Sequence, residues 1–238
     1  MKNCEFRFFA TDAELAQAAA RQWLHLASTK FAQGHSVALS GGRITPAFLA
    51  AVVEEARQLK FTFDHVHFFW ADERCVPPDD AESNFRLANE SLFQPLAIAL
   101  DHIHRIKGEL DPNKAVQLAN DDLRALPPAG ENMPLLDIVF LGLGPDGHTA
   151  SLMPNASPEI EENPGPYLFV PNSPKPPPRR ITLSYKALWA ARNVWALVAG
   201  ADKEEALRLS LRTGARTPFG RVLEGRKQTE VFSSVPLS

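Results

Sequence analysis

Short apolar runs alternate along the chain with longer segments in which apolar positions recur at helical spacing. The clearest run is Leu136-Asp-Ile-Val-Phe-Leu141, which is almost continuously apolar. Such a run is typical of a strand buried on both faces of a parallel sheet. The same reasoning predicts further strands at 36–39, 66–70, 180–183 and 194–199.

Capping residues and prolines mark where the predicted helices begin. Thr11-Asp-Ala-Glu14 is a capping-box sequence, so we expect a helix from there that stops by Gly34. Pro46 suits the first turn of a helix that runs to about Lys60. Further helices are predicted from about Asn84, from Asp111-Pro112, between the strands 180–183 and 194–199, and after Asp202.

Three segments between these elements are predicted to be largely irregular. A polar loop follows residue 70 and extends through Asp80. The glycine-rich segment 142–147 is expected to lead into a short helical turn that stops at Pro154. The stretch 154–178 is rich in proline, which removes backbone donors, so we interpret it as a surface loop.

Strand–helix alternation from end to end predicts the fold class. It favours an α/β fold with a mostly parallel sheet and helices on both faces, that is, a Rossmann-like arrangement. The length of 238 residues fits a single domain over 1–238. In such sheets ligands bind at the carboxyl ends of the strands, so the loops that follow the strands are the ones to inspect.

Composition narrows the classes of function. The net charge is −3, which argues against a nucleic-acid partner, and no apolar run is long enough to suggest a membrane span. The charged N-terminal segment does not resemble a signal peptide. Cys4 and Cys75 lie far apart and match no metal-ligand spacing. We therefore expect a cytoplasmic protein with reduced thiols, no metal and no cofactor, as a monomer or alternatively a homodimer.

The first loop with candidate chemistry runs from Ser40 to Pro46. Gly41 and Gly42 let the backbone approach a ligand, and free N–H groups before a helix favour an anion. Ser40 and Thr45 add hydroxyl groups. The Gly-Lys-Ser/Thr ending of a nucleotide-triphosphate loop is missing. The alternative is a tight turn in which Thr45 caps the helix.

The second loop begins with Asp72-Glu73-Arg74, just beyond the strand 66–70. Arg74 could hold a phosphate through its planar guanidinium, and Asp72 could face a substrate hydroxyl or position a water molecule. The alternative is a solvated cluster of ion pairs. Ser83-Asn84 downstream is interpreted as a helix cap.

The third loop, Gly142–His148, contains the spacing G-x-G-x-x-G that is found in dinucleotide-binding folds. Pro145 removes a donor from the phosphate turn, and Pro154 would end the following helix too early. The acidic residues about twenty positions further on, Glu161 and Glu162, lie in the proline-rich stretch and not at a strand end. An NAD-dependent oxidoreductase is therefore disfavoured.

What remains in this loop is His148, two residues after Asp146. A histidine there can accept a proton from water near neutral pH, while the carboxylate selects its tautomer. The alternative is a structural histidine that caps a helix. The other histidines lack a glycine-rich setting and are interpreted as structural: His25, His35, His65, His67, His102 and His104.

Two cations complete the candidate set. Arg180 begins a strand after the proline-rich stretch, and Lys203 begins a helix after Gly200. A lysine in a first helical turn opposes the helix dipole, a cost that a bound anion would offset. An ordinary surface lysine is the alternative.

In their order along the chain, these segments resemble the 6-phosphogluconolactonases, within the wider family that includes glucosamine-6-phosphate deaminases. The resembling segments are 39–46, 72–84, 142–154, 177–182 and 200–203. The loop Ser-Gly-Gly-Arg-Ile-Thr-Pro is one residue longer than the common Ser-Gly-Gly-Ser-Thr-Pro, and Met153 stands where phenylalanine is usual.

The resemblance implies hydrolysis of 6-phospho-D-glucono-1,5-lactone to 6-phosphogluconate in the oxidative pentose phosphate pathway, without a metal. It implies His148 as the general base and Asp72 as an active-site carboxylate. Arg74, Arg180 and Lys203 match the family's cationic positions. Ser40, Gly41, Gly42 and Thr45 are expected to hold the phosphate.

Two rival hypotheses remain open. Glucosamine-6-phosphate deaminases usually carry a carboxylate shortly after the Asp-Gly-His sequence, and none occurs among Thr149–Pro154 here. A non-catalytic sugar-phosphate sensor would be favoured by loss of His148 or Asp72, and both are present.

Overall fold

The structure is a computed structural model that describes residues 4–29, 34–129 and 133–237. The strands of the described residues are β1 (Cys4–Phe8), β2 (His35–Leu39), β3 (Val66–Trp70), β4 (Asp72–Arg74), β5 (Ile138–Leu141), β6 (Tyr167–Val170), β7 (Arg180–Leu183), β8 (Asn193–Val198) and β9 (Thr229–Ser233). The α-helices are α1 (Asp12–Thr29), α2 (Thr45–Leu59), α3 (Asn84–Ala88), α4 (Pro112–Leu123), α5 (Pro158–Glu161), α6 (Tyr185–Ala190), α7 (Glu204–Ser210) and α8 (Pro218–Glu224). A π-helical turn, η1 (Asn89–Phe93), and two 3₁₀ turns, η2 (Leu100–His102) and η3 (Ala201–Lys203), complete the list.

Six strands of the described residues form one parallel sheet in the order β1-β9-β8-β5-β2-β3. From β2 the chain moves to β3 at one edge, and from β5 it moves through β8 and β9 toward the other. The direction of winding therefore reverses between β2 and β5, which is where ligands bind in open parallel sheets.

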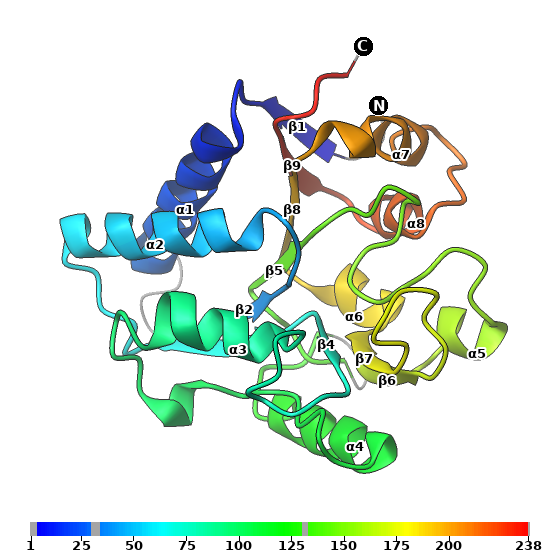
Figure 1. Cartoon of the computed structure of the whole chain (residues 1–238), viewed down its shortest axis with the longest axis horizontal. Coiled ribbons are helices and arrows are strands. Elements are labelled where there is room, and N and C mark those ends of the chain that lie inside the picture. Colours follow the sequence, from blue (N-terminus) through cyan, green and yellow to red (C-terminus); the bar gives the residue numbers. More distant parts are fainter. Residues whose placement is uncertain (1–3, 30–33, 130–132, 238) are drawn as a thin grey trace.

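Helices cover both faces of this sheet. In Figure 1, α1 and α2 lie on one side of the column of strands, and α6, α7 and α8 lie on the other. This arrangement confirms the predicted α/β fold with helices on both faces.

An aromatic cluster joins β5 to the helices of one face. The Phe140 ring lies 4.6 Å from the Phe48 ring of α2, 5.4 Å from the Trp23 ring of α1 and 5.8 Å from the Trp195 ring of β8, measured between centroids. All four side chains are buried. Each such burial contributes about 1.5–3 kcal/mol to stability, so β5 and the loop after it rest on a rigid base.

The structure corrects several predictions from the sequence. Asp72–Arg74 is not loop but the short strand β4, and β7 pairs antiparallel with β4 and β6 in a second, three-stranded sheet. The stretch 154–178 contains β6 and α5. No helical turn follows residue 147, because Thr149 and Leu152 form an isolated bridge instead. The edge strand β1 and its neighbour β9 were not predicted.

Several predictions of helix starts are confirmed. The Thr11 hydroxyl accepts a hydrogen bond from the Glu14 N–H, and Asp111 caps α4 through the N–H groups of Asn113 and Lys114. The Ser83 hydroxyl caps α3. The first helix ends at Thr29, and its predicted stop before Gly34 falls partly on residues 30–33, outside the described residues.

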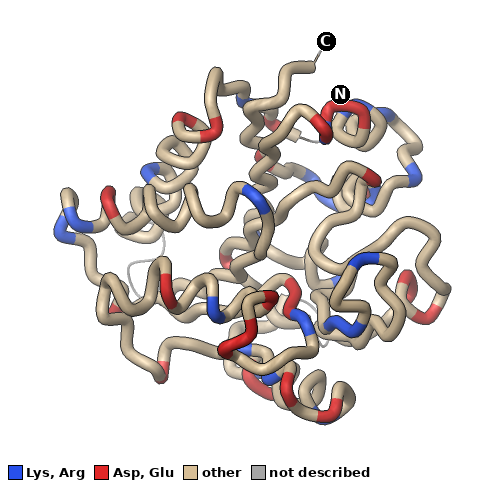
Figure 2. The backbone as a smooth tube through the Cα atoms, viewed as in Figure 1, with Lys and Arg blue, Asp and Glu red and all other residues tan. Residues whose placement is uncertain are grey.

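Surface charge is mixed rather than concentrated. Figure 2 shows the positions of Lys and Arg interspersed with those of Asp and Glu along the backbone. Within the described residues, no helix has the length and apolarity that a membrane crossing needs. Cys4 and Cys75 are both free thiols, as predicted.

Candidate active site

Four loops meet at the carboxyl ends of adjacent strands and enclose a pocket of about 210 Å³. They follow β8, β5, β2 and β3, which are neighbours in the sheet. The pocket is lined by residues 40–44, Asp72, Arg74, residues 142–145, His148, Ala150, Arg180, Asp202 and Lys203. Segments that lie far apart in the sequence are thus brought together where the winding reverses.

The loop after β2 presents free backbone donors to this pocket. The N–H groups of residues 41–44 donate to no described residue, and they precede α2, a helix of 15 residues. Gly42 has a φ of +118°, a conformation that L side chains rarely adopt. Consecutive free N–H groups at the start of a long helix attract an anion.

The two hydroxyl groups of this loop are used within the protein. The Ser40 hydroxyl donates to the Phe140 carbonyl at 2.7 Å, and the Thr45 hydroxyl donates to the Ser40 carbonyl at 3.0 Å. Thr45 is buried and does not line the pocket. In the structure it supports the loop, so a direct contact of Thr45 with a ligand stays a prediction.

Asp72 lies on β4, at the floor of the pocket and almost fully buried. Its Oδ2 accepts a hydrogen bond from the Ser151 hydroxyl at 2.6 Å, and its backbone carbonyl accepts one from the Asn84 amide at 2.8 Å. The Arg180 Nη1 lies 4.0 Å from the same Oδ2. The carboxylate is thereby held in one orientation beside the pocket.

The neighbouring Glu73 ties β4 to α3 and does not line the pocket. Its carboxylate accepts hydrogen bonds from the N–H groups of Arg74, Asn84 and Phe85, at 2.7–2.8 Å, and from the Ser83 hydroxyl. Burial raises the pKa of Glu73 to about 7, against the opposite effect of these backbone donors. Asn84 therefore both begins the helix and holds Asp72.

Arg74 lines the pocket, and one of its N–H donors has no acceptor among the described residues. Its Nη1 donates to the Glu82 carbonyl at 2.7 Å, whereas its buried Nε has no partner among the described residues. A buried donor without an acceptor is costly, so an acceptor on a ligand would be favourable here.

His148 and Asp146 form a close pair in the turn after β5. Asp146 Oδ1 lies 2.5 Å from His148 Nδ1, which directs the other ring nitrogen, Nε2, away from the pair. Gly144 makes this approach possible, because a Cβ there would lie 1.9 Å from His148 Nδ1. His148 lines the pocket, while Asp146 lies behind it.

Burial governs the ionisation of this pair. It lowers the pKa of His148, and the contact with Asp146 only partly offsets this effect. Burial would raise the pKa of Asp146, but the hydrogen bond and charge of His148 lower it to about 2. A neutral imidazole beside an ionised carboxylate is the state that a general base requires near neutral pH.

Lys203 is a pocket cation that has no partner among the described residues. It is only 7% exposed, it lines the pocket, and its ammonium makes no hydrogen bond or ion pair to a described residue. Burial and the nearby Arg43 lower the pKa of Lys203. It is the last residue of the 3₁₀ turn η3 and the N-cap of α7, so it lies at the start of the helix that was predicted after Gly200.

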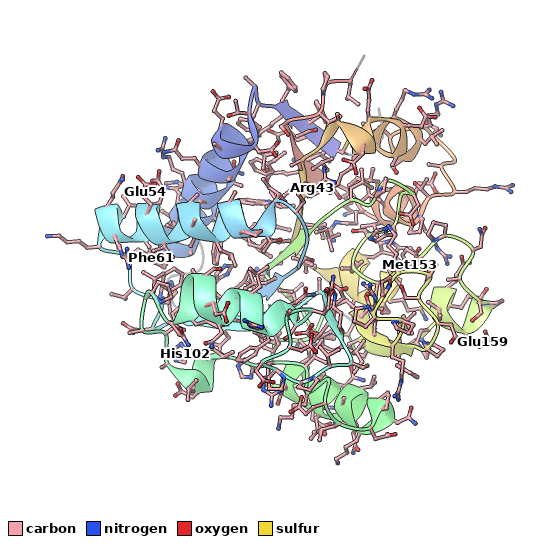
Figure 3. All side chains as sticks on the ribbon, in the orientation of Figure 1. Arg43, Glu54, Phe61, His102, Met153 and Glu159 are labelled. Carbon is pink, nitrogen blue, oxygen red and sulfur yellow. The ribbon has the colours of Figure 1, made fainter. Side chains whose placement is uncertain are left out.

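Arg43 belongs to the unusual part of the loop after β2. Figure 3 labels it at the start of α2. Its Nη1 and Nη2 donate to the two carboxylate oxygens of Asp202, at 2.7 and 3.1 Å, and both residues line the pocket. The pair joins the loop after β2 to the loop after β8.

Arg180 lines the pocket but is heavily engaged by the protein. Its guanidinium donates to the carbonyls of Pro177, Lys175 and Pro176, at 2.9–3.2 Å. It therefore anchors the proline-rich segment against β7. A role for Arg180 in binding a phosphate stays a prediction.

The structure brings most of the predicted site residues to one pocket: Ser40, Gly41, Gly42, Asp72, Arg74, His148, Arg180 and Lys203. Sequence reasoning missed Arg43, Asp202, Ser151 and Lys175. No local sequence pattern indicates that Arg43 pairs with Asp202, because the two residues are far apart in the sequence. Lys175 was missed because it lies in a proline-rich stretch that was interpreted as a surface loop. No group of three or more His, Cys, Asp or Glu side chains is placed to hold a metal ion within the described part of the chain.

Comparison with known proteins identifies the family to which the chain belongs. Residues 10–231 match the family described as glucosamine-6-phosphate isomerases/6-phosphogluconolactonase. A 6-phosphogluconolactonase of Mycobacterium tuberculosis is 38% identical over 179 residues, covering 72% of this chain and 70% of that protein. One of Treponema pallidum is 33% identical over 171 residues, with the same coverage.

Solved structures agree with this family. A 6-phosphogluconolactonase from Trypanosoma brucei superposes with a TM-score of 0.85 at 29% identity, covering 98% of this chain and 97% of that one. One from Thermotoga maritima gives 0.80 at 28% identity, with coverage of 97% and 98%. A monomeric glucosamine-6-phosphate deaminase, at 18% identity and a TM-score of 0.79, shares the fold.

Proposed function

Since the chain belongs to the family of glucosamine-6-phosphate isomerases and 6-phosphogluconolactonases, we propose that this enzyme hydrolyses 6-phospho-D-glucono-1,5-lactone to 6-phosphogluconate. The reaction would serve the oxidative pentose phosphate pathway. The observation that carries the proposal is one pocket lined both by His148, which is paired with Asp146, and by Lys203, which has no partner among the described residues.

The phosphate of the substrate would bind at the start of α2. The free N–H groups of residues 41–44 and the Lys203 ammonium are donors that a phosphate accepts well. The unsatisfied Nε of Arg74 offers a further donor. A phosphate there would supply the partner that these groups lack.

The lactone would then lie against His148. Its Nε2 takes a proton from a water molecule as the water oxygen attacks the lactone carbonyl. When the tetrahedral intermediate collapses, the bond from the former carbonyl carbon to the ring oxygen breaks. The imidazolium returns its proton to that oxygen, and the resulting carboxylic acid loses its own proton to solvent. Asp146 keeps the reactive tautomer and stabilises the imidazolium, as carboxylates do in other His–Asp pairs.

Asp72 is proposed to orient the substrate or the water. Its carboxylate faces the pocket and is fixed by Ser151. No carboxylate follows His148 in the segment 149–154, where Thr149 and Ser151 are buried instead. This segment disfavours the ring-opening and deamination chemistry of the deaminases.

His148→Ala tests the assignment of the base. We expect kcat to fall by about 10²–10⁴-fold, with an unchanged unfolding midpoint, because the ring lies at a pocket and not in the core. The measurement is the disappearance of freshly generated 6-phosphogluconolactone, corrected for spontaneous hydrolysis. His25→Ala, at an exposed position of α1, is the matched control.

Two results would overturn the proposal. One is a wild-type rate no greater than the spontaneous background, and the other is unchanged turnover by His148→Ala. Release of ammonia from glucosamine 6-phosphate by the wild type would instead support a deaminase.

A further inference from the structure

Lys175 contacts both members of the His148–Asp146 pair. Its Nζ lies 3.0 Å from His148 Nδ1 and 3.3 Å from Asp146 Oδ1. It does not line the pocket, so it does not belong to the set of groups that would hold the phosphate. No step proposed above uses it.

Asp146 and Lys175 both lie near His148 Nδ1, but only one of them can form a hydrogen bond with that nitrogen. The 2.5 Å separation between Asp146 Oδ1 and His148 Nδ1 requires a proton between these two atoms. A protonated Nδ1 has no lone pair for Lys175 to donate to. Lys175 therefore donates to Asp146, and its 3.0 Å approach to the ring places a positive charge beside the imidazole.

The backbone around Lys175 keeps this charge in place. Its carbonyl and that of Pro176 accept hydrogen bonds from the guanidinium of Arg180, a buried residue at the start of β7. The Lys175 N–H also donates to the Ser173 hydroxyl. Lysine at this position is thus held by its own loop and is only about one-third exposed at the side chain.

We propose that Lys175 is a positioning residue, which orients Asp146 and disfavours protonation of His148, so that the base remains neutral at lower pH. This inference rests on the proposed role of His148 as the base. The ammonium would extend activity toward acid rather than bind the substrate.

The charges that face His148 come from three segments. Asp146 precedes it in its own turn, Asp72 approaches from β4 and Lys175 from the proline-rich segment. Both carboxylates favour the imidazolium, and Lys175 opposes it. Lys203 lies near enough to Lys175 for the two charges to repel each other. Removal of Lys175 takes away the positive charge that opposes the two carboxylates, so protonation of the imidazole becomes more favourable although its burial is unchanged.

Lys175→Met tests this inference, because methionine keeps most of the apolar stem and removes the charge. We expect the acid limb of the kcat/KM profile to move to higher pH. The ratio of kcat/KM at pH 5.5 to that at pH 7.5 should fall by roughly threefold or more relative to wild type, with KM little changed. Lys175→Arg should restore the wild-type profile, and Lys186→Met, at an exposed position of α6, should not alter it.

A second measurement separates this inference from the proposed function. NMR titration of the His148 ring, assigned by its loss in His148→Asn, reports protonation whether or not the lactone is the substrate. A higher titration midpoint in Lys175→Met supports the inference. An unchanged or lower midpoint overturns it, as does a wild-type ring nitrogen spectrum with the proton on Nε2. Absence of lactonase activity with a raised midpoint would overturn the function alone.

Discussion

Gly144 and His148 approach each other within a turn so tight that no side chain fits between them. The Gly144 N–H donates to the His148 carbonyl at 2.8 Å, which closes the turn. A Cβ at residue 144 would also lie 2.7 Å from Asp146 Oδ1. At the scale of single residues, this glycine serves the geometry of the pair and not a dinucleotide.

Gly144→Ala should lower the rate of lactone turnover strongly while changing the free energy of unfolding little. The new methyl group would push the His148 ring away from Asp146, and a displacement of about 1 Å in a catalytic group costs on the order of a hundredfold in rate. The free energy of unfolding should change by less than about 2 kcal/mol, because the ring can rotate into the pocket. Lactone turnover and denaturant unfolding provide the two measurements.

Gly34→Ala is the control for this variant, since a Cβ there meets no atom within 4 Å. Full activity of Gly144→Ala would show that the close contact between Asp146 and His148 is not needed for turnover.

At the scale of elements, β4 and α3 hold the acidic side of the pocket through Glu73. The Glu73 carboxylate accepts hydrogen bonds from the Ser83 hydroxyl and from the N–H groups of Asn84 and Phe85. It also accepts one from the N–H of Arg74, the next residue of β4. The same helix then supplies Asn84 to the carbonyl of Asp72. The antiparallel sheet is therefore tied to α3 beside the site.

Glu73 should make stability depend on pH. Its folded pKa of about 7 lies above the ordinary value of 4.5, so the folded state binds the proton more tightly than the unfolded state. Stability from this group is full below about pH 4.5 and is lost as pH rises toward 7. Between pH 5 and pH 7.5 the wild type should lose on the order of 1–3 kcal/mol relative to Glu73→Gln.

Urea unfolding of both proteins at the two pH values measures this difference. Glu54→Gln is the control, because Glu54 lies exposed on α2, as labelled in Figure 3. A constant difference between wild type and Glu73→Gln would refute the raised pKa.

At the scale of the whole molecule, one edge of the parallel sheet carries a cluster of histidines that the proposed reaction does not use. His67 Nδ1 lies 3.0 Å from His104 Nε2, and the His67 ring stacks on that of His102 with centroids 4.7 Å apart. His104 stacks on Phe69. These contacts fit the structural roles predicted for these residues.

We also retain the proposal of a single domain over 1–238, since the main apolar cluster includes residues of both sheets.

The histidine cluster of His67, His102 and His104 should destabilise the fold in acid. Burial lowers the pKa of both His67 and His104, with the charges of neighbouring histidines adding to the effect. Their contribution to stability is complete above the unfolded pKa of about 6.5 and is lost as pH falls below it. We expect the wild type to lose stability between pH 7.5 and pH 5 relative to His67→Gln.

Thermal or urea unfolding across this range measures the loss. His25→Gln, on the exposed side of α1, should follow the wild type. Parallel curves for wild type and His67→Gln would exclude the cluster as the source of acid sensitivity.

The sequence alone determined the main strands, the helix starts and most of the pocket. β5 was predicted because a nearly continuous apolar run is a local signal, and Asp111 and Ser83 were recognisable as caps because capping depends on neighbouring residues. Since the carboxyl ends of parallel strands meet at one edge, the loops after β2, β3, β5 and β8 could be predicted to share a site.

Only the tertiary structure decided the pairings that join distant segments. β6 was hidden because prolines surround Tyr167–Val170, and it exists as a strand through its pairing with β7. The edge strand β1 pairs with β9 across almost the whole length of the sequence. Lys175 reaches His148 only because Arg180 holds its loop against the second sheet. A local pattern encodes an element, but a contact between distant residues depends on how the elements pack.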